Sequence, residues 1–258
     1  MYSFLQYELN SRVCRITMDR PAKRNALHGG MIREMDQAFA AATEDEGVRV
    51  IVISGSGDSF CAGADLDELR LLQDRSYAEN LGDSRQLMNL YLRILGTPKP
   101  VVAEVNGPAI AGGCGLVLCA DLCYASPRSS FGFTEVRIGF IPALVSVLLR
   151  RRMGDLRTRE LLLTGKLIRA EKAAEMGLIN GVIPTDGLPN HIGKLTTELS
   201  QEVSPQSIAK TKGLLEATST LPLRQAMELA AAMNAEARSS EACKKGMAAF
   251  LNREKIKW

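Results

Sequence analysis

Residues 100–120 are PVVAEVNGPAIAGGCGLVLCA, a β-rich run that passes through a glycine-rich turn into an apolar helical run. A second segment has the same order, because RVIVIS at 49–54 leads into GSGDSFCAGADL at 55–66. Small residues in such turns let another group approach the backbone closely, where amide N–H groups can donate hydrogen bonds. The two segments therefore predict an α/β fold in which turns after strands carry the chemistry.

Further strand and helix patterns alternate along the chain. Residues 13–18 alternate like a half-buried strand, and 122–125 and 181–183 are weaker strand candidates. Apolar residues repeat at three and four between Met31 and Ala42, and again over 77–95, as in amphipathic helices. Gly47 follows the first of these stripes as a plausible stop, and Asp65 or Asp67 is expected to cap the helix after the first turn.

The pattern becomes wholly helical from about residue 197. We therefore expect a core over residues 1–196 and a C-terminal helical region over 197–258. Such helices either pack on a neighbouring subunit or fold back on their own core, and the pattern leaves both arrangements open.

Composition excludes several classes of protein. With 258 residues, 46% hydrophobic and 24% charged, the chain can bury a large core without disulfides. A net charge of +3 does not indicate a nucleic-acid partner. The N-terminal residues lack a signal-peptide pattern and the apolar stretches are too short for a bilayer, so we expect a cytoplasmic protein with no membrane insertion.

The cysteines and histidines do not predict a metal site. Most of the six cysteines lie in apolar runs, as buried free thiols do in a reducing compartment. The chain has two histidines, and neither lies near Cys119 and Cys123, so the usual zinc spacings are missing. We expect no metal.

The two glycine-rich turns have one plain and one functional interpretation. They are either tight connections or, if they face each other, two sets of amide donors that form an oxyanion hole. The turn at 106–116 precedes a helix, whose N-terminus favours negative charge. Dinucleotide binding is disfavoured because Gly55-Ser56-Gly57 lacks the third glycine in register, and no Gly-Lys-Ser/Thr of a P-loop follows.

Six blocks in order carry a resemblance over nearly the full chain: DRPAKRNAL at 19–27, FCAGADL at 60–66, KPVVAEVNG at 99–107, AGGC at 111–114, FGFTEVRIGFIP at 131–142 and AEKAAEMGLI at 170–179. In these blocks the chain resembles the enoyl-CoA hydratase/isomerase (crotonase) family. The resemblance implies a crotonase-type spiral of ββα units followed by C-terminal helices, and a homotrimer or dimer of trimers. It also implies an acyl-CoA thioester substrate, with coenzyme A as part of the substrate and no separate cofactor.

The resemblance also assigns residues. Ala64 and Gly112 match the two oxyanion donors, and Ala62 matches the residue whose backbone meets the adenine. The stretch from Lys23 through Arg24 and Ala26 to Leu27 borders coenzyme A, where a cation suits the phosphates. The other expected substrate or coenzyme A contacts are Asp65, Leu66, Gly113 and, reaching from an adjoining subunit, Lys255.

One position departs from the family's hydratases, which resemble one another in using two glutamates to hold a water. The second falls on Glu135, but the first falls on Gly115, which has no side chain to exchange a proton. One glutamate suffices to move a proton between two carbons of a thioester enolate, so the resemblance implies double-bond isomerisation or hydration with Glu135 as acid/base. A purely structural Glu135, paired with Arg137, is the alternative.

Other functions stay open. Hydration could persist if Glu135 alone positions water, or if Glu104 or Asp65 enters the site, although each also suits a strand-end or cap role. The missing carboxylate is expected to leave room for a branched acyl group, as in a methylglutaconyl-type hydratase or a decarboxylase. From another class, the chain could be a catalytically inactive acyl-CoA-binding subunit. Selectivity for acyl length is expected to depend on the region Gln73–Leu95.

Overall fold

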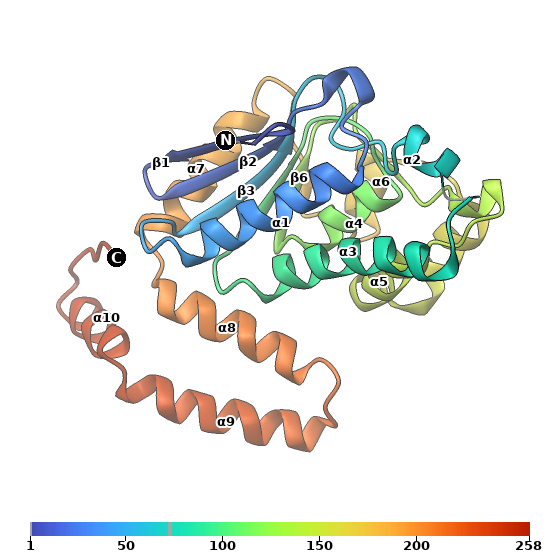
Figure 1. Cartoon of the computed structure of the whole chain (residues 1–258). Helices are drawn as coiled ribbons and strands as arrows, with labels where there is room; N and C mark the ends of the chain where they lie inside the picture. The colour runs from blue at the N-terminus through green and yellow to red at the C-terminus, as the bar shows by residue number, and fades with distance from the viewer. Residues whose placement is uncertain (1, 72–73) are drawn as a thin grey trace.

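The computed structural model describes residues 2–71 and 74–258, and their main element is a six-stranded sheet (Figure 1). The sheet has the order β1-β2-β3-β4-β6-β9, in which β1 and β2 are antiparallel and the other neighbours are parallel. The strands are Leu5–Asn10 (β1), Val13–Met18 (β2), Val50–Gly55 (β3), Val101–Val105 (β4), Leu122–Ala125 (β6) and Gly181–Val182 (β9). The expected strands are confirmed, and β1 is added to them.

A second, three-stranded sheet includes part of the second glycine-rich turn. It consists of Ala109–Ile110 (β5), Ser130–Gly132 (β7) and Ile168–Arg169 (β8), in the order β5-β7-β8. β5 is the middle of the second glycine-rich turn and runs parallel to β7. The pairing of β5 with β7 fixes the end of this turn, directly before the helix that starts at Gly112.

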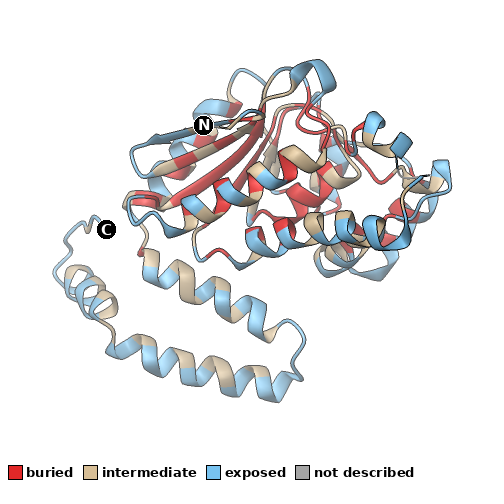
Figure 2. Cartoon of the chain, in the orientation of Figure 1, coloured by how far each residue is buried: buried red, intermediate tan, exposed pale blue. Residues whose placement is uncertain are grey.

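Three helices form the layer next to one face of the large sheet: α1 (Gly29–Glu44), α3 (Tyr77–Gly96) and α4 (Gly112–Cys119). The stripe predicted for α1 is buried, and the helix ends before Gly47. A capping box of Ser76 and Glu79 starts α3. Figure 2 shows the buried residues concentrated where these helices and the sheet meet.

The opposite face of the sheet is covered by α7 (Leu188–Gln201). Leu188 and Ile192 pack there on Val50, Val52 and Val102. The continuous helical region therefore begins at Leu188, earlier than the predicted start at residue 197. The difference arises because Leu188 and Ile192 form a four-residue apolar repeat that belongs to the sheet's second face.

The remaining elements lie around the glycine-rich turns and at the edge of the core. They are η1 (Pro21–Lys23), α2 (Leu66–Leu71), η2 (Glu135–Ile138), α5 (Ala143–Thr164) and α6 (Ala170–Glu175). Helix α5 has a non-helical break at Gly154, where φ is 74°. The mixture of a parallel sheet, covering helices and a helical C-terminal region confirms the α/β class.

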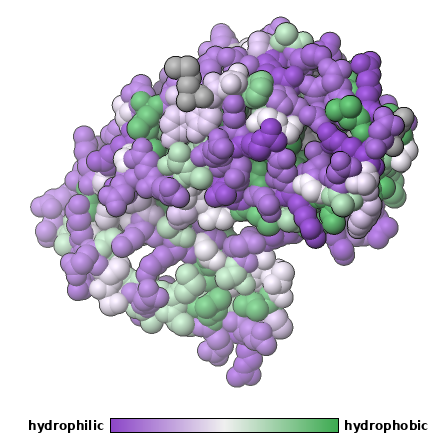
Figure 3. Space-filling view, viewed as in Figure 1, coloured by the Kyte–Doolittle hydropathy of each residue, from purple (hydrophilic) through white to green (hydrophobic). Residues whose placement is uncertain are grey.

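The C-terminal helices meet this core through the first of them, where Lys212 pairs with Asp121 and Glu216 pairs with Arg151. They are α8 (Pro205–Thr218), α9 (Leu223–Ser239) and α10 (Glu241–Leu251), and none of them contains a buried residue. Leu223 is 79% exposed and Phe250 is 81% exposed. Figure 3 shows hydrophobic side chains gathered on this part of the surface. The end of the chain returns to the core, where the Trp258 N–H donates to the Gln201 carbonyl at 3.0 Å, so polar contacts hold the C-terminal region while its large apolar side chains stay exposed.

In the ranges that the structure covers, no helix is both long and apolar enough to cross a membrane.

Candidate active site

The two glycine-rich turns lie against each other. The Ile110 N–H donates to the Cys61 carbonyl at 2.9 Å, and Cys61 forms a parallel bridge with Ala109. A Cβ on Gly63 would lie 3.0 Å from the Ile110 carbonyl oxygen, so the backbones are in close contact there. The fold therefore brings the two turns together, which is the arrangement that the functional interpretation of these turns requires.

Two amides at this junction have no protein acceptor. They belong to Ala64 and to Gly112, the first residue of α4, and over residues 2–71 and 74–258 neither N–H makes a hydrogen bond. Each follows a residue with positive φ, 90° at Gly63 and 49° at Ala111. A positive φ is uncommon for alanine and costs conformational energy, and such strain is found preferentially at functional sites.

Leu27 holds the Ala64 turn in place. The Leu27 N–H donates to the Gly63 carbonyl at 2.7 Å, and its carbonyl accepts from the Asp65 N–H at 2.8 Å. Because these bonds use the residues on either side of Ala64, the N–H of Ala64 itself points away from Leu27. A Cβ on Gly112 would lie 3.1 Å from the Leu27 Cδ1, so this buried side chain also borders the second amide.

Glu135 is joined to the second turn through β7. The Ala111 N–H donates to the Gly132 carbonyl at 2.8 Å, and Glu135 follows three residues later as the first residue of η2. Its Oε2 is buried and has no hydrogen-bond partner among the described residues, and the ion pairs found among them do not include Glu135 with Arg137. Burial raises the pKa of Glu135, against a smaller lowering by its own backbone N–H. A raised pKa in a buried carboxyl is typical of a group that exchanges protons.

Gly115 does not leave an empty space. A Cβ at this position would lie 2.1 Å from the Tyr91 Oη and 2.3 Å from its Cζ, so the phenol of Tyr91 fills the place of a side chain. The expectation of room for a branched acyl group was therefore wrong at this position. Tyr91 comes from α3, within the apolar stripe over 77–95, and nothing in that periodicity marks it as different from a core residue.

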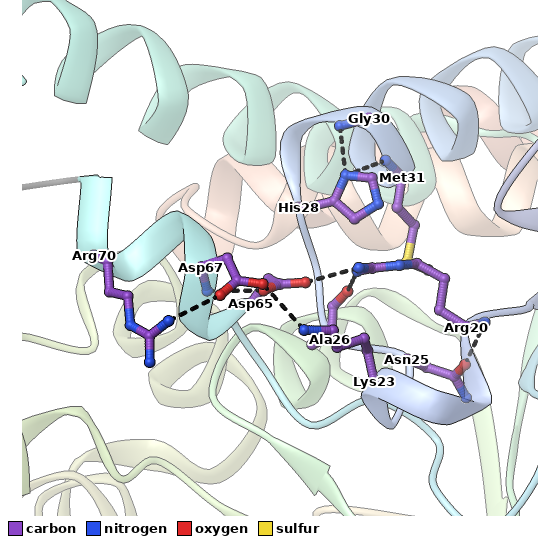
Figure 4. A network of polar contacts seen from close by, with 10 residues as sticks. All are labelled: Arg20, Lys23, Asn25, Ala26, His28, Gly30, Met31, Asp65, Asp67 and Arg70. Carbon is purple, nitrogen blue, oxygen red and sulfur yellow. Dashed lines mark hydrogen bonds and ion pairs between the residues drawn. The ribbon is translucent and has the colours of Figure 1, made fainter.

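The loop over residues 20–27 is tied to the first turn by Arg20, a residue that was not among the predicted site residues (Figure 4). Its guanidinium lies 2.8 Å from the buried carboxylate of Asp65 and donates to the Ala26 carbonyl at 2.8 Å. Burial favours a higher pKa for Asp65, but the Asp67 N–H and Arg20 outweigh it and hold the pKa below its usual value. Asp65 is the cap of α2, because its Oδ1 accepts from the Asp67 N–H at 2.9 Å.

Asn25 is a second residue that the sequence analysis missed. Its φ is 55°, its side chain is fully buried, and it donates to the carbonyls of Ser56 and Ser59 while accepting from the Arg20 N–H. An asparagine directly after two cations is the sequence signal that could have found it, because asparagine is the non-glycine residue that most readily adopts the left-handed conformation. Together Arg20 and Asn25 hold the loop against the first turn.

The predicted cations on this loop are exposed. Lys23 pairs with Asp67 at 3.0 Å, and the Arg24 carbonyl accepts from the Ala62 N–H at 3.0 Å. Lys23, Arg24 and Ala62 thus lie together on one side of the Ala64 turn. Figure 4 shows Lys23 and Asp67 in this loop region.

Other predicted residues have different places. Gly113 is buried, and a Cβ there would lie 2.4 Å from the Cys61 carbonyl, so this glycine allows the two turns to touch. Leu66 is exposed at the start of α2. Lys255 lies in the C-terminal tail, and Figure 1 shows the C-terminus on the other side of the molecule from α2, so this one chain does not bring the tail to the site.

The spare carboxylates are also accounted for. Glu104 pairs with Arg15 at 2.7 Å, on the side of β4 that carries Val102 and faces α7, away from α4. Asp65 is engaged by Arg20. Neither therefore supplies a second carboxylate beside Glu135. Of the region Gln73–Leu95, Gln73 lies outside the described residues.

No group of three or more potential metal ligands is found in the described ranges. The cysteines outside the C-terminal region are buried free thiols: Cys14, Cys61, Cys114, Cys119 and Cys123. Burial raises the pKa of Cys61 to about 12, so this thiol next to the Ala64 turn stays protonated at neutral pH.

Comparison with known proteins decides the family. Residues 8–258 match the enoyl-CoA hydratase/isomerase family. The chain belongs to this family of enzymes. A Thermus thermophilus protein that bears the name enoyl-CoA hydratase is 39% identical over 238 residues, which cover 92% of this chain and 94% of that protein. The 2,3-dehydroadipyl-CoA hydratase of Escherichia coli is 30% identical, covering 94% of this chain and 93% of its own.

Solved structures show that this family member has the crotonase fold. The enoyl-CoA hydratase of Shewanella pealeana superposes with a TM-score of 0.94 at 31% identity, covering 99% of this chain and 96% of that one. An enoyl-CoA hydratase/isomerase (crotonase) of Legionella pneumophila has a TM-score of 0.92 at 32% identity, covering 98% of each chain. The predicted crotonase fold is confirmed over almost the whole chain.

Proposed function

We propose that this enzyme moves a proton on an enoyl-CoA thioester, with Glu135 as the acid/base and the N–H groups of Ala64 and Gly112 as the oxyanion donors. The proposal depends above all on one observation: a half-buried carboxyl with an unpaired oxygen is joined to a turn whose amide also has no partner. Two such N–H groups stabilise negative charge on a thioester oxygen more than the neutral carbonyl, which lowers the barrier to enolate formation.

The reaction that one carboxylate serves best is the isomerisation of a 3-enoyl-CoA. Glu135 takes the proton from C2, and the electrons of that C–H bond form the C1=C2 double bond of a dienolate, O⁻–C1=C2–C3=C4, whose charge rests on the thioester oxygen. Glu135 then returns the proton to C4, and the double bond has moved from C3=C4 to C2=C3. No other atom is gained or lost, so the step needs neither a cofactor nor a second base.

Hydration of a 2-enoyl-CoA is the second candidate. It is favoured by relatives, because the Thermus thermophilus and Escherichia coli proteins above are both named as hydratases. In this chain Glu135 would have to position the water alone, since Gly115 supplies no carboxylate and Glu104 and Asp65 are paired elsewhere. We therefore rank isomerisation first.

Coenzyme A recognition is assigned to the loop that Arg20 and Asn25 hold. We propose that Lys23 or Arg24 meets the phosphates, that Ala62 meets the adenine, and that Ala26 and Leu27 border the pantetheine arm. The exposure of both cations next to the Ala62 backbone supports this assignment. The buried Asp65 acts by fixing the loop through Arg20.

Assembly and location belong to the same proposal. A homotrimer or a dimer of trimers would cover the exposed apolar residues of α8 to α10 and could bring Lys255 of a partner to the coenzyme. A reducing, cytoplasmic location suits five buried free cysteines.

Parallel assays with 3-hexenoyl-CoA and crotonyl-CoA test the proposal. The enoyl thioester absorbance rises when the first is isomerised and falls when the second is hydrated. We expect a higher kcat/KM for 3-hexenoyl-CoA. The reverse order would favour the hydratase, and coenzyme A binding without turnover of either thioester would indicate an inactive binding subunit.

A further inference from the structure

We propose that Tyr91 is the specificity-determining residue of the site: its phenol occupies the place of a second acid/base side chain and restricts the enzyme to chemistry with one carboxylate. The proposal deepens the function above and rests on it. Tyr91 belongs to α3 and to no recognised motif, and it lies 24 positions before Gly115 in the sequence.

The contact with Gly115 is close along the whole tip of the ring. A Cβ on Gly115 would lie 2.1 Å from Oη, 2.3 Å from Cζ and 2.9 Å from Cε2 of Tyr91. Real Cβ atoms do not approach other heavy atoms to such distances, so residue 115 must be glycine while Tyr91 stays where it is. The pair Tyr91–Gly115 therefore acts as one unit, in which a side chain from α3 replaces a side chain from α4.

Tyr91 is fixed in this position from two directions. It is 3% exposed, next to the fully buried Leu90 and one turn from Ile94 on α3. Its hydroxyl donates to the Gly112 carbonyl at 2.8 Å, in the first turn of α4. The same hydroxyl lies 3.5 Å from where a Cβ of Gly112 would be, which places the phenol next to the residue whose N–H is the proposed oxyanion donor.

The phenol has different chemistry from the carboxylate that it replaces. Burial, together with nearby thiols and the Glu135 carboxyl, raises the pKa of Tyr91 well above its usual range, so the group stays neutral. Its only proton is committed to the Gly112 carbonyl. Tyr91 is therefore no base for activating water, and its ring fills space in which a second water-binding group would stand. A proton shuttle by Glu135 needs neither a base that activates water nor a second water-binding group.

A stability cycle tests whether the phenol occupies this place without any need for turnover. In the wild-type background Gly115→Ala should lower Tm by about 5 °C or more, because the added methyl overpacks against the ring. With Tyr91→Leu, which removes the ring tip, the same Gly115→Ala change should leave Tm equal or higher, because alanine suits a helix better than glycine. Equal effects of Gly115→Ala in both backgrounds would overturn the steric part of the proposal.

A reaction-partition experiment tests the consequence for specificity. The double variant Tyr91→Leu/Gly115→Glu should raise the ratio of crotonyl-CoA hydration to 3-hexenoyl-CoA isomerisation by about 10-fold or more, since a second acid/base group contributes at least that. The matched control is Tyr91→Phe/Gly115→Glu, which keeps the ring and should not show the gain.

The outcomes separate this proposal from the proposed function. An unchanged ratio in a folded double variant that still binds an acyl-CoA would contradict the role of Tyr91. If the wild-type enzyme turned over neither thioester, the proposed function would fail, whereas the Tm cycle would still decide whether Tyr91 fills the place of residue 115.

Discussion

Gly112 illustrates how a single backbone position can carry chemistry. It is the first residue of α4, so its N–H has no partner inside the helix, and the φ of 49° at Ala111 sets the direction of the peptide between them. The helix N-terminus adds a favourable field for negative charge. We therefore attribute oxyanion stabilisation to the backbone rather than to a side chain.

Replacing Gly112 by proline removes this donor at the first position of α4, where no hydrogen bond within the helix is lost. We expect kcat/KM to fall by about 10²- to 10³-fold, the usual effect of losing one oxyanion donor. Gly112→Ala is the matched control, because it keeps the N–H and adds a methyl 3.1 Å from the flexible end of Leu27. Equal losses in the two variants would show that the N–H is not the feature that matters.

Glu135 makes the rate depend on pH in a direction that its burial determines. The base must be ionised, and burial raises its pKa, so kcat/KM should fall with decreasing pH through a pKa above the ordinary range of glutamate. The folded state also binds this proton more tightly than the unfolded state, so the group costs stability as pH rises through that pKa. Glu135→Gln should thus raise Tm relative to wild type more at pH 8 than at pH 4, and the opposite trend would contradict the assignment.

Some site residues could be predicted from the sequence and others could not. Ala64, Gly112 and Glu135 lie in the ordered blocks that carry the family resemblance, and the resemblance assigns their roles. Tyr91 gave no such signal, because its role depends on a contact with Gly115 from a different helix. The emptiness inferred from Gly115 was wrong for the same reason: a missing side chain says nothing about which neighbour fills its space.

At the scale of elements, the loop over 20–27 and helix α2 form one unit. Arg20 bonds the Ala26 carbonyl and the Asp65 carboxylate, while Asp65 also caps α2. The unit positions Ala64 through the bonds of Leu27 to Gly63 and Asp65. Damage to this ion pair should therefore reach both stability and substrate binding.

Arg20→Met leaves the buried Asp65 carboxylate without its partner and should lower the free energy of unfolding by about 3 kcal/mol. It should also raise KM for acyl-CoA, because the loop loses its anchor. Lys23→Met is the comparison, since its pair with Asp67 is exposed and should contribute less than about 1 kcal/mol. That variant should raise KM several-fold with Tm nearly unchanged. Similar Tm losses in Arg20→Met and Lys23→Met would contradict the distinction between Arg20, which anchors the loop, and Lys23, which contacts the ligand.

Most elements could be predicted because their apolar periodicity is strong, as in α1 and the strands β2 to β4. The two-residue strands β5, β8 and β9 are set by pairing with distant segments, so no local pattern identifies β5 or β8. The predicted start of the helical region at residue 197 misses the first turns of α7, because Leu188 and Ile192 are two apolar residues whose role appears only when they pack on the second face of the sheet.

For the whole molecule, the exposed apolar residues of helices α8 to α10 bear on whether chains associate. They contain no buried residue, and large apolar side chains on them are exposed: Leu215, Leu223, Met227, Met247, Phe250 and Leu251. A surface of this kind on an isolated chain indicates association with another chain. This arrangement suits the trimer or dimer of trimers that we propose.

Light scattering after size exclusion tests that assembly. We expect the wild-type mass to be three or six times the chain mass of 28.0 kDa. Leu223→Glu puts a charge on α9 and should shift the mass toward that of one chain, whereas Leu9→Glu on the edge strand β1 should not. A monomeric wild-type protein, or a Leu223→Glu variant with unchanged mass, would contradict the role given to these helices.

The central claim is that one carboxylate, Glu135, moves the proton while two amides hold the anion. The most direct measurement is kcat of wild type and Glu135→Gln with 3-hexenoyl-CoA, followed by the rise in enoyl thioester absorbance. The expected result is a fall of about 10²- to 10⁴-fold in the variant, with substrate binding retained. Equal rates in the two proteins would contradict the account.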